Sequence, residues 1–243
     1  MTLLLLAGTA EARAVATALA ERADRRVLAS LAGVTASPRP LPVPTRRGGF
    51  GGAAGFRACL QDHGIRAVID ATHPFAARIS ARTARICAER GMPYLQLLRP
   101  PWVPGPEDRW TVIPREEAAA ALIPPESVVF LATGQQRVAR FAGIRAARVH
   151  IRRAGPGPAP FPFAAGGYVD AGPATEPADE IRLFRSLRVD LLVVRNAGGR
   201  TGQAKLIAAR HLGLPVLMID RPPQPKASRA TTVAEALTWI DRL

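Results

Sequence analysis

The chain has 243 residues, of which 48% are hydrophobic and 5% aromatic, and its formal net charge is +14 at pH 7. This length suits one large α/β domain or two small ones, and no apolar run approaches the eighteen or so residues that would span a bilayer. The charge indicates an anionic partner. Because the arginines are dispersed and not interleaved with aromatic residues, the composition disfavours nucleic acid and favours a small polyanion.

Cysteines and histidines occur singly. Cys59 and Cys87 lack C-x-x-C spacing, and the four histidines are scattered. Lone thiols are typical of a reducing compartment, and the histidines show no metal-ligand spacing. No basic residue precedes the opening leucines, and Glu11 and Arg13 end that run. We therefore expect a cytoplasmic protein with no export signal and no metal site.

The first thirteen residues predict a buried strand, a tight turn and a helix. Four leucines run into Ala7-Gly8-Thr9, and apolar residues then recur at helical spacing. Thr9 is a good helix N-cap, Gly8 allows a ligand to approach, and the helix start directs unpaired amides into the turn. The full dinucleotide fingerprint needs three glycines, so a strand-helix unit without a ligand remains the alternative.

A second strand is predicted over residues 26–31. An NAD site would carry an acidic residue about 20 positions past the glycine turn, whereas here Ser30 is followed by Leu-Ala-Gly. Ser30 and the arginines at 39, 46 and 47 can bind a 2′-phosphate, which favours NADPH; the alternative is that these arginines are solvated. Residues 45–52 are glycine-rich and are expected to form a flap before a helix at 56–62.

The next strand is predicted over residues 67–71. Thr72-His73-Pro74-Phe75 then turns into a long helix, with Pro74 in its first turn. Ligands of open α/β sheets bind at the carboxyl ends of strands, so we expect Thr72 and His73 beside the Gly8-Thr9 turn. The alternative for His73 is a helix-entry residue bonded to backbone.

The proline-rich stretch 99–106 follows a strand at 93–98 and predicts a domain boundary. We expect one domain over 1–100 and a second over 101–243, both Rossmann-like α/β domains with largely parallel sheets and a cleft between them. In the second half, strands are expected at 110–113, 127–132, 149–152, 190–194 and 215–219, and helices at 115–122, from 135, at 178–187, from 202 and at 232–242. Residues 154–163 are expected to form an irregular loop.

A second anion-binding junction is predicted after residues 190–194. Arg195-Asn196-Ala197-Gly198-Gly199 precedes a helix that carries Lys205 in its first turn. Exposed amides, a helix N-terminus and basic side chains suit carboxylates or phosphates. The alternative is a glycine-rich turn with a solvated lysine.

Taken together, these motifs resemble those of the precorrin-6A reductase family of cobalamin biosynthesis, including its cobalt-precorrin relatives. Ala7 stands where the family usually has glycine, and Val34 where it often has arginine, so the arginines at 39, 46 and 47 are the candidates for the 2′-phosphate. The matching stretches run nearly end to end: Ala7-Gly8-Thr9-Ala10-Glu11-Ala12-Arg13, Ser30-Leu31-Ala32-Gly33, Arg47-Gly48-Gly49-Phe50-Gly51-Gly52, Asp70-Ala71-Thr72-His73-Pro74-Phe75-Ala76, Arg195-Asn196-Ala197-Gly198-Gly199 and residues 205–222.

The resemblance implies an NADPH-dependent oxidoreductase that reduces one double bond of the precorrin-6A macrocycle to give precorrin-6B. We expect NADPH at Gly8, Thr9, Glu11, Ser30, Arg46 and Thr72. Carboxylates of the tetrapyrrole would bind Arg13, Thr133, Gly134, Arg195, Asn196, Gly198, Gly199 and Lys205. His73 and Lys205 are the candidate proton donors, beside water and a carboxyl group of the substrate.

Three other functions stay open at this point. The first is NADPH-dependent reduction of another polycarboxylate. The second is a non-catalytic basic protein that binds nucleic acid, and the third is a tetrapyrrole carrier. Steeply salt-dependent binding without nucleotide would indicate the second.

Overall fold

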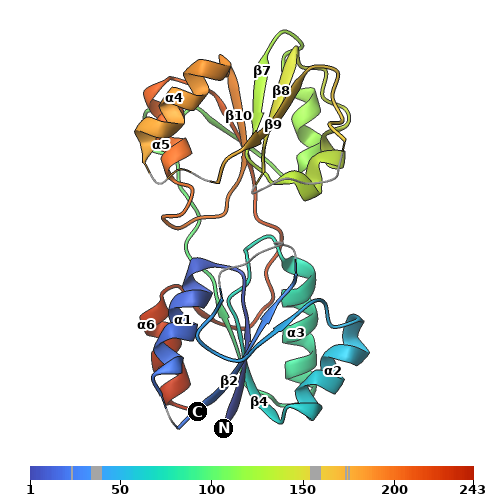
Figure 1. Ribbon diagram of the computed structural model, residues 1–243, viewed down its shortest axis with the longest axis vertical. Helices are drawn as coiled ribbons and strands as arrows, with labels where there is room; N and C mark the ends of the chain where they lie inside the picture. The colour runs from blue at the N-terminus through green and yellow to red at the C-terminus, as the bar shows by residue number, and fades with distance from the viewer. Residues whose placement is uncertain (23, 34–39, 154–159, 173, 175) are drawn as a thin grey trace. The chain divides into compact units, whose positions relative to one another are not determined.

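The computed structural model describes the chain except for residues 23, 34–39, 154–159, 173 and 175. It divides into two compact units, drawn in Figure 1. Unit 1 comprises residues 1–100 and 222–243, and unit 2 comprises residues 101–221. Each unit contains one six-stranded sheet in which all paired strands are parallel, which confirms the α/β class.

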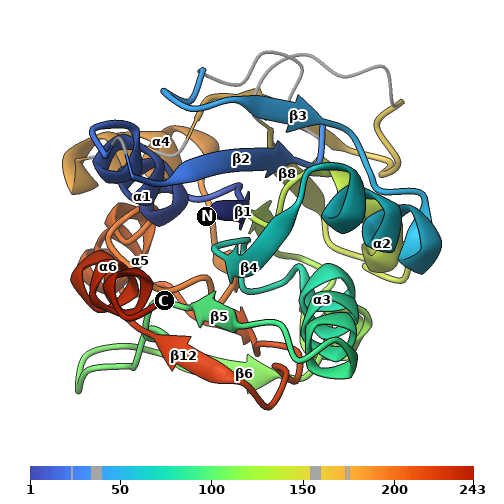
Figure 2. The same cartoon turned by 90° about the horizontal axis from the view of Figure 1, so that it is seen from below.

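The sheet of unit 1 has the strand order β12-β5-β4-β1-β2-β3, which can be followed in Figure 2. Its strands are β1 (Thr2–Leu6), β2 (Arg26–Leu31), β3 (Thr45–Arg47), β4 (Ile65–Asp70), β5 (Tyr94–Leu97) and β12 (Ser228–Ala230). Its helices are α1 (Ala10–Ala20), α2 (Gly52–Asp62), α3 (Ala77–Glu89) and α6 (Val233–Asp241).

Helices cover both faces of this sheet, which explains the uninterrupted leucines of β1. Leu3 and Leu5 belong to a buried cluster with residues of α1 and α6. Leu4 and Leu6 belong to a second cluster with residues of α2 and α3. Figure 1 shows these helix pairs on opposite sides of the sheet. A central strand buried on both faces reads as a continuous apolar run.

Unit 2 has the strand order β6-β11-β10-β7-β8-β9. Its strands are β6 (Trp110–Ile113), β7 (Val128–Leu131), β8 (Arg148–Arg153), β9 (Gly166–Asp170), β10 (Leu191–Arg195) and β11 (Val216–Ile219). Helices α4 (Pro177–Leu187) and α5 (Ala204–His211) pack on one face around Phe130, Phe184 and Leu192. Two 3₁₀ helices, η1 (Glu116–Ala121) and η2 (Gln135–Phe141), lie on the other face, in green and yellow-green in Figure 1.

The two sheets share one topology. The sixth strand of each sheet follows, along the chain, a strand of the other sheet. In unit 1 the chain runs from β1 outward to β2 and β3 and then returns to β4 and β5; β7 to β11 repeat this path in unit 2. β6 follows β5 along the chain but pairs in unit 2, and β12 follows β11 but pairs in unit 1. The second domain therefore does not extend over 101–243 as expected, because residues 222–243 complete unit 1.

Several local predictions were wrong. Thr45–Arg47 forms an edge strand in the stretch expected to be a flap. The helices expected at 115–122 and from 135 are present, and both are 3₁₀ helices. α3 begins at Ala77, three residues after Pro74. β9 and β12 lie where no strand was expected; of the predicted loop at 154–163, residues 154–159 lie outside the described part of the chain.

Candidate functional site

The strand order of unit 1 reverses between β1 and β4, and ligands of open α/β sheets bind at the carboxyl ends of the strands at such a point. We call this place the crevice of unit 1. The Ala71 amide donates to the Leu6 carbonyl at 2.9 Å, and Thr9 Oγ1 donates to the Ala71 carbonyl at 2.8 Å. These bonds bring the Gly8-Thr9 turn beside the residues that follow β4. The neighbourhood predicted for Thr72 and His73 is thereby confirmed.

The Gly8-Thr9 turn is open and helix-capped. Gly8 has φ +153°, and no atom lies within 4 Å of the position that a Cβ would take. Thr9 Oγ1 accepts the Ala12 amide at 3.1 Å, as expected of the N-cap of α1. Because the hydroxyl is occupied by these two bonds, Thr9 shapes the turn, and the unpaired amides of the helix start are the groups that can bind an anion.

Ser30 and Arg46 form a pair at the carboxyl ends of β2 and β3. They are register partners in the two strands, and Arg46 Nη1 donates to Ser30 Oγ at 2.7 Å. Arg46 also donates to the carbonyls of Gly48 and Gly49, and its guanidinium lies 4.1 Å from the ring centroid of Phe50. A cation is thus held in place beside a buried hydroxyl. Of the other two arginine candidates, Arg47 is exposed and residue 39 lies outside the described ranges.

Glu11 and Arg13 are both engaged within unit 1. Glu11 Oε2 accepts from Arg99 Nη1 at 2.7 Å in a largely buried ion pair. Arg13 Nη1 donates to the Pro40 carbonyl at 2.6 Å. The pair between Glu11 and Arg99 neutralises the one carboxylate in the first turn of α1, which would otherwise repel an anion there.

Asp70 is a site residue that the sequence analysis missed. It is 1% exposed at the end of β4, and its Oδ1 accepts from the Thr72 amide at 3.1 Å and from Thr72 Oγ1 at 2.6 Å. Its Oδ2 accepts from the Tyr94 hydroxyl at 2.8 Å. Burial and the adjacent Asp70 raise the pKa of Tyr94, so the phenol keeps its proton. The hydroxyl of Thr72 is directed at this carboxylate. The sequence signal that could have identified Asp70 is an acidic residue at the end of an apolar strand.

His73 is bonded to backbone, as in the alternative considered for it. Its Nδ1 accepts from the Phe75 amide at 3.2 Å, and its ring centroid lies 5.8 Å from that of Phe75. In the neutral ring, a nitrogen that accepts leaves the proton on the other. Nε2 is therefore the proton-bearing atom of His73.

The matching crevice of unit 2 lies between the ends of β7 and β10. Thr133 is 1% exposed, and its Oγ1 has no hydrogen-bond partner among the described residues. Arg195 Nη2 lies 3.8 Å from the position that a Cβ on Gly134 would take. Burial lowers the pKa of Arg195 to about 10, and the positive charge of Arg137 adds to this shift. The guanidinium still carries its charge at neutral pH.

The loop after β10 is braced by the segment that enters unit 2. Asn196 Oδ1 accepts the Trp102 amide at 2.8 Å, and Asn196 Nδ2 donates to the Trp102 carbonyl at 3.0 Å. Trp102 Nε1 donates to the Gly199 carbonyl at 2.7 Å. The side chain of Asn196 thus binds protein backbone, while Gly198 and Gly199 take φ values of +67° and +70° that only glycine adopts readily.

Lys205 is buried rather than solvated, so the structure contradicts the alternative considered for it. It is 8% exposed, its Nζ donates to the Gly202 carbonyl at 2.8 Å, and Nζ lies 5.7 Å from the Trp102 ring centroid. Burial lowers the pKa of Lys205 from 10.5 to about 8, partly offset by Glu180. Glu180 itself forms a buried two-point ion pair with Arg152, at 2.6 and 2.7 Å.

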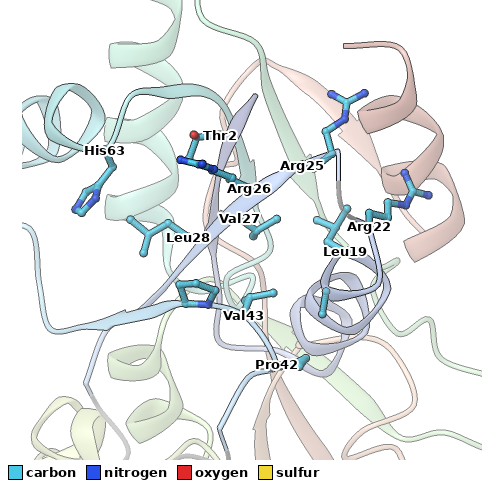
Figure 3. Close-up of a pocket in the computed structure, with 12 residues that line it drawn as sticks. Thr2, Leu19, Arg22, Arg25, Arg26, Val27, Leu28, Pro42, Val43 and His63 are labelled. Atoms are coloured by element: carbon cyan, nitrogen blue, oxygen red, sulfur yellow. The ribbon is translucent and has the colours of Figure 1, made fainter.

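One hollow of about 520 Å³ lies at the other edge of the sheet in unit 1, around the amino-terminal ends of β1 and β2 (Figure 3). Arg22 and Arg25, on its rim, are paired with Asp241 and Asp24. Ligands of parallel sheets bind at the carboxyl edge, so we assign this hollow no part in the site.

The described ranges contain neither a metal-binding cluster nor a membrane-spanning helix. Within them, no three His, Cys, Asp or Glu side chains are grouped so that they could hold a metal ion. No helix in the same part of the chain has the length and apolar character needed to cross a membrane.

Comparisons with known proteins match this chain over nearly its whole length. Residues 2–241 match the family model "Precorrin-6x reductase CbiJ/CobK". The chain is 43% identical to a precorrin-6A reductase of Rhodococcus erythropolis, with 99% of this chain and 98% of that one covered. It is 42% identical to one of Rhodobacter capsulatus, with 98% and 95% covered. A solved structure described as CobK precorrin-6A reductase superposes with a TM-score of 0.93 at 40% identity, covering 100% of this chain and 96% of that chain.

Proposed function

The chain belongs to the precorrin-6x reductase family CbiJ/CobK, and from that premise we propose that NADPH, bound at the carboxyl edge of the sheet in unit 1, is its reductant. Its activity is that of a precorrin-6A reductase in cobalamin biosynthesis. This sets aside the other polycarboxylate reductase, the nucleic-acid-binding protein and the tetrapyrrole carrier considered above. The free thiols of Cys59 and Cys87 support the cytoplasm as its location.

The paired Ser30 and Arg46 are the observation that carries this proposal. A 2′-phosphate distinguishes NADPH from NADH, and a guanidinium with fixed geometry binds it through charge-assisted hydrogen bonds. An acid at the end of β2, which would accept from a free 2′-hydroxyl, is missing from Ser30-Leu31-Ala32-Gly33. Arg46 is already held by Ser30 and two carbonyls, so little side-chain entropy is lost on binding.

The remaining cofactor contacts follow from the crevice. The open turn at Gly8 and the amides at the start of α1 suit the pyrophosphate. Thr9 and Thr72 shape the crevice through their bonds to Ala71 and Asp70, and Glu11 acts through its ion pair with Arg99. When bound, the nicotinamide supplies the hydride; His73, on the β4 side, is proposed to border it.

We assign the carboxylates of the substrate to the crevice of unit 2. Thr133 offers a buried hydroxyl, Gly134 and Gly198-Gly199 offer backbone amides, and Arg195 and Lys205 offer positive charge. Asn196 contributes by fixing the loop after β10, and Arg13 of unit 1 remains a proposed contact. A cleft between the units stays a prediction.

Of the two proposed proton donors, we favour Lys205. A pKa of about 8 leaves its ammonium mostly protonated near neutral pH while making proton loss easier than for a solvated lysine. His73 holds its proton at Nε2. Positioning of the reactants accounts for a large part of many enzymatic accelerations, so water or a carboxyl group of the substrate remains a sufficient source.

We propose that the substrate is the cobalt-free macrocycle. The relatives called precorrin-6A reductase are 41–43% identical to this chain. Those called cobalt-precorrin-6A reductase are 26–29% identical.

An assay of nucleotide oxidation with two acceptors tests both choices. The enzyme is mixed with NADPH or NADH and with precorrin-6A or its cobalt complex, and loss of reduced nucleotide is followed together with the pigment spectrum. We expect the highest kcat/KM for NADPH with precorrin-6A. Equal rates with NADH and NADPH would refute the role of Ser30 and Arg46. Faster turnover of the cobalt complex than of precorrin-6A would refute the proposal that the substrate is free of cobalt.

A further inference from the structure

Gln224 occupies the segment by which the chain returns to unit 1, and its amide joins three elements. Nε2 donates to the Pro222 carbonyl at 2.7 Å and to the Pro74 carbonyl at 3.0 Å. Oε1 accepts from Gln96 Nε2 at 2.8 Å. Gln96 is 4% exposed and is the register partner of Asp70 in the adjacent strand.

The bond to Pro74 bears on the turn that follows β4. Other bonds hold this turn from nearby in the sequence, since Asp70 binds Thr72, and the Phe75 and Ala76 amides donate to His73. Gln224 reaches the same turn from 150 residues further along the chain. It therefore links the backbone directly after His73 to β5, through Gln96.

The strand order determines which half of a dinucleotide this turn can touch. β2 and β3 lie on one side of β1, and β4 and β5 lie on the other (Figure 2). With the pyrophosphate at Gly8 and the 2′-phosphate at Arg46, the adenosine half extends over β2. The nicotinamide half then extends over β4, where the turn held by Gln224 lies.

We propose that Gln224 is a positioning residue for the nicotinamide half of the cofactor, acting through Pro74 on the turn that carries Thr72 and His73. This role rests on the proposed binding of NADPH in unit 1. Since the amide bonds Pro74, Pro222 and Gln96, its effect is on the placement of the turn.

Two substitutions separate positioning from anchoring of the chain. Gln224→Met keeps the length of the side chain and removes all three hydrogen bonds. Gln224→Glu keeps an acceptor for Gln96 Nε2 but cannot donate to Pro74 or Pro222, so the anchor to β5 remains. Lys226→Met is the matched control, because Lys226 is exposed on the same segment. Melting curves of each variant report whether the fold is retained.

The readouts are the Kd of NADPH, the Kd of 2′,5′-ADP, which lacks the nicotinamide, and kcat with precorrin-6A. For both Gln224 variants we expect the Kd of NADPH to rise about three- to tenfold, because the free energy needed to place the turn, about that of one hydrogen bond, is then subtracted from the binding free energy. We expect kcat to fall and the Kd of 2′,5′-ADP to stay within about twofold of its starting value. Lys226→Met should leave all three quantities unchanged.

Three results would overturn the positioning role. One is equal weakening of NADPH and 2′,5′-ADP, which indicates a general loss of structure. Another is a loss with Gln224→Met that Gln224→Glu does not share, which indicates an anchor only. The third is unchanged binding and kcat in both variants. Failure of the proposed function looks different: either the wild-type enzyme would bind neither NADPH nor 2′,5′-ADP, or Arg46→Met would bind both as tightly as the wild type.

Discussion

Arg46 is charged, ordered and placed on the strand next to Ser30, so its contribution can be measured by the selectivity between the two nicotinamide cofactors. Arg46→Met removes the guanidinium and keeps a long side chain. A hydrogen bond to a charged group contributes about 1.5–3 kcal/mol, so we expect the KM for NADPH to rise by roughly 10- to 100-fold. The KM for NADH should not change, because NADH has no 2′-phosphate.

Arg47→Met is the control for this prediction. Arg47 lies on the same edge strand, is exposed and is the next residue along. Its replacement alters the net charge equally but should leave the ratio of the two KM values as it was. A similar loss of NADPH selectivity in both variants would mean that overall charge, and not the pair of Ser30 and Arg46, selects the cofactor.

Lys205 connects stability to pH. Its folded-state pKa of about 8 lies below the ordinary 10.5, so the unfolded chain binds more protons between these values. The free energy of unfolding therefore rises with pH between about 8 and 10.5. Below pH 8 the full cost of burying the charged ammonium destabilises the folded state. The difference corresponds to on the order of 3 kcal/mol.

The measurement compares the wild type with Lys205→Met by urea unfolding at about pH 7 and about pH 10. The variant carries no titrating group at this position, so the other ionisations cancel in the comparison. We expect the wild type to gain stability relative to the variant as the pH rises. A difference in unfolding free energy that stays constant over this range would show that the ammonium is not disfavoured in the folded protein.

A residue whose partners are distant in the sequence cannot be found from the local pattern around it. Gly8, Thr9 and Ser30 lie at the ends of strands that are visible as apolar runs, so periodicity brought them to one edge. Arg46 was a candidate for its charge alone, because its strand, Thr45–Arg47, is not apolar. Gln224 gives no such signal, since its role depends on partners 128 and 150 residues away.

Two helix N-caps allow the Gly8-Thr9 turn to be tested as part of an element. Thr9 caps α1 and also bonds Ala71, the residue that follows β4, whereas Thr232 caps α6 by accepting the Glu235 amide at 3.2 Å. Both residues have extended backbone, which valine adopts readily. Thr9→Val should lower the unfolding free energy by about 2 kcal/mol and Thr232→Val by about 1.

Cofactor affinity gives the second half of this prediction. Only Thr9→Val should weaken NADPH binding, because only its cap stands at the crevice. Urea unfolding and nucleotide titration of the two variants provide the measurements. If Thr232→Val weakened NADPH to the same degree, the effect would reflect the stability of unit 1 and not the geometry of the turn.

Element prediction succeeded where a strand is long and apolar and failed where it is short. β3 and β12 have three residues each, too few to show alternation. β9 opens with two glycines, which strands usually lack. Gly166 is required there because a Cβ would lie 1.9 Å from the Val149 carbonyl oxygen. The glycine that lowers the strand propensity of this segment is therefore the residue that allows β9 to pair with β8.

At the scale of the whole molecule, the crossing of the chain explains why one domain boundary was foreseeable and the other was not. The prolines at 100 and 101 interrupt an apolar pattern visibly. The return at Pro222 is equally rich in proline, but beyond it no strand was expected, and the helix predicted at 232–242 looks like one more helix of the preceding domain. Only pairing of β12 with β5 and packing of α6 beside α1 assign them to unit 1.

This crossing predicts an asymmetric response to truncation. Deletion of residues 222–243 removes Ala230, Ala236 and Ile240 from the core of unit 1 and uncovers Leu95 and Leu97. Full burial of a large apolar side chain contributes roughly 1.5–3 kcal/mol, against a total stability of about 5–15 kcal/mol for a typical domain. The shortened chain should therefore lose NADPH binding and the protease resistance of residues 1–100.

Unit 2 is contiguous and complete, so residues 101–221 should stay protease-resistant and should also melt cooperatively as a separate fragment. Unchanged affinity for NADPH after the deletion would mean that the C-terminal strand and helix are dispensable, and that unit 1 is a contiguous domain after all.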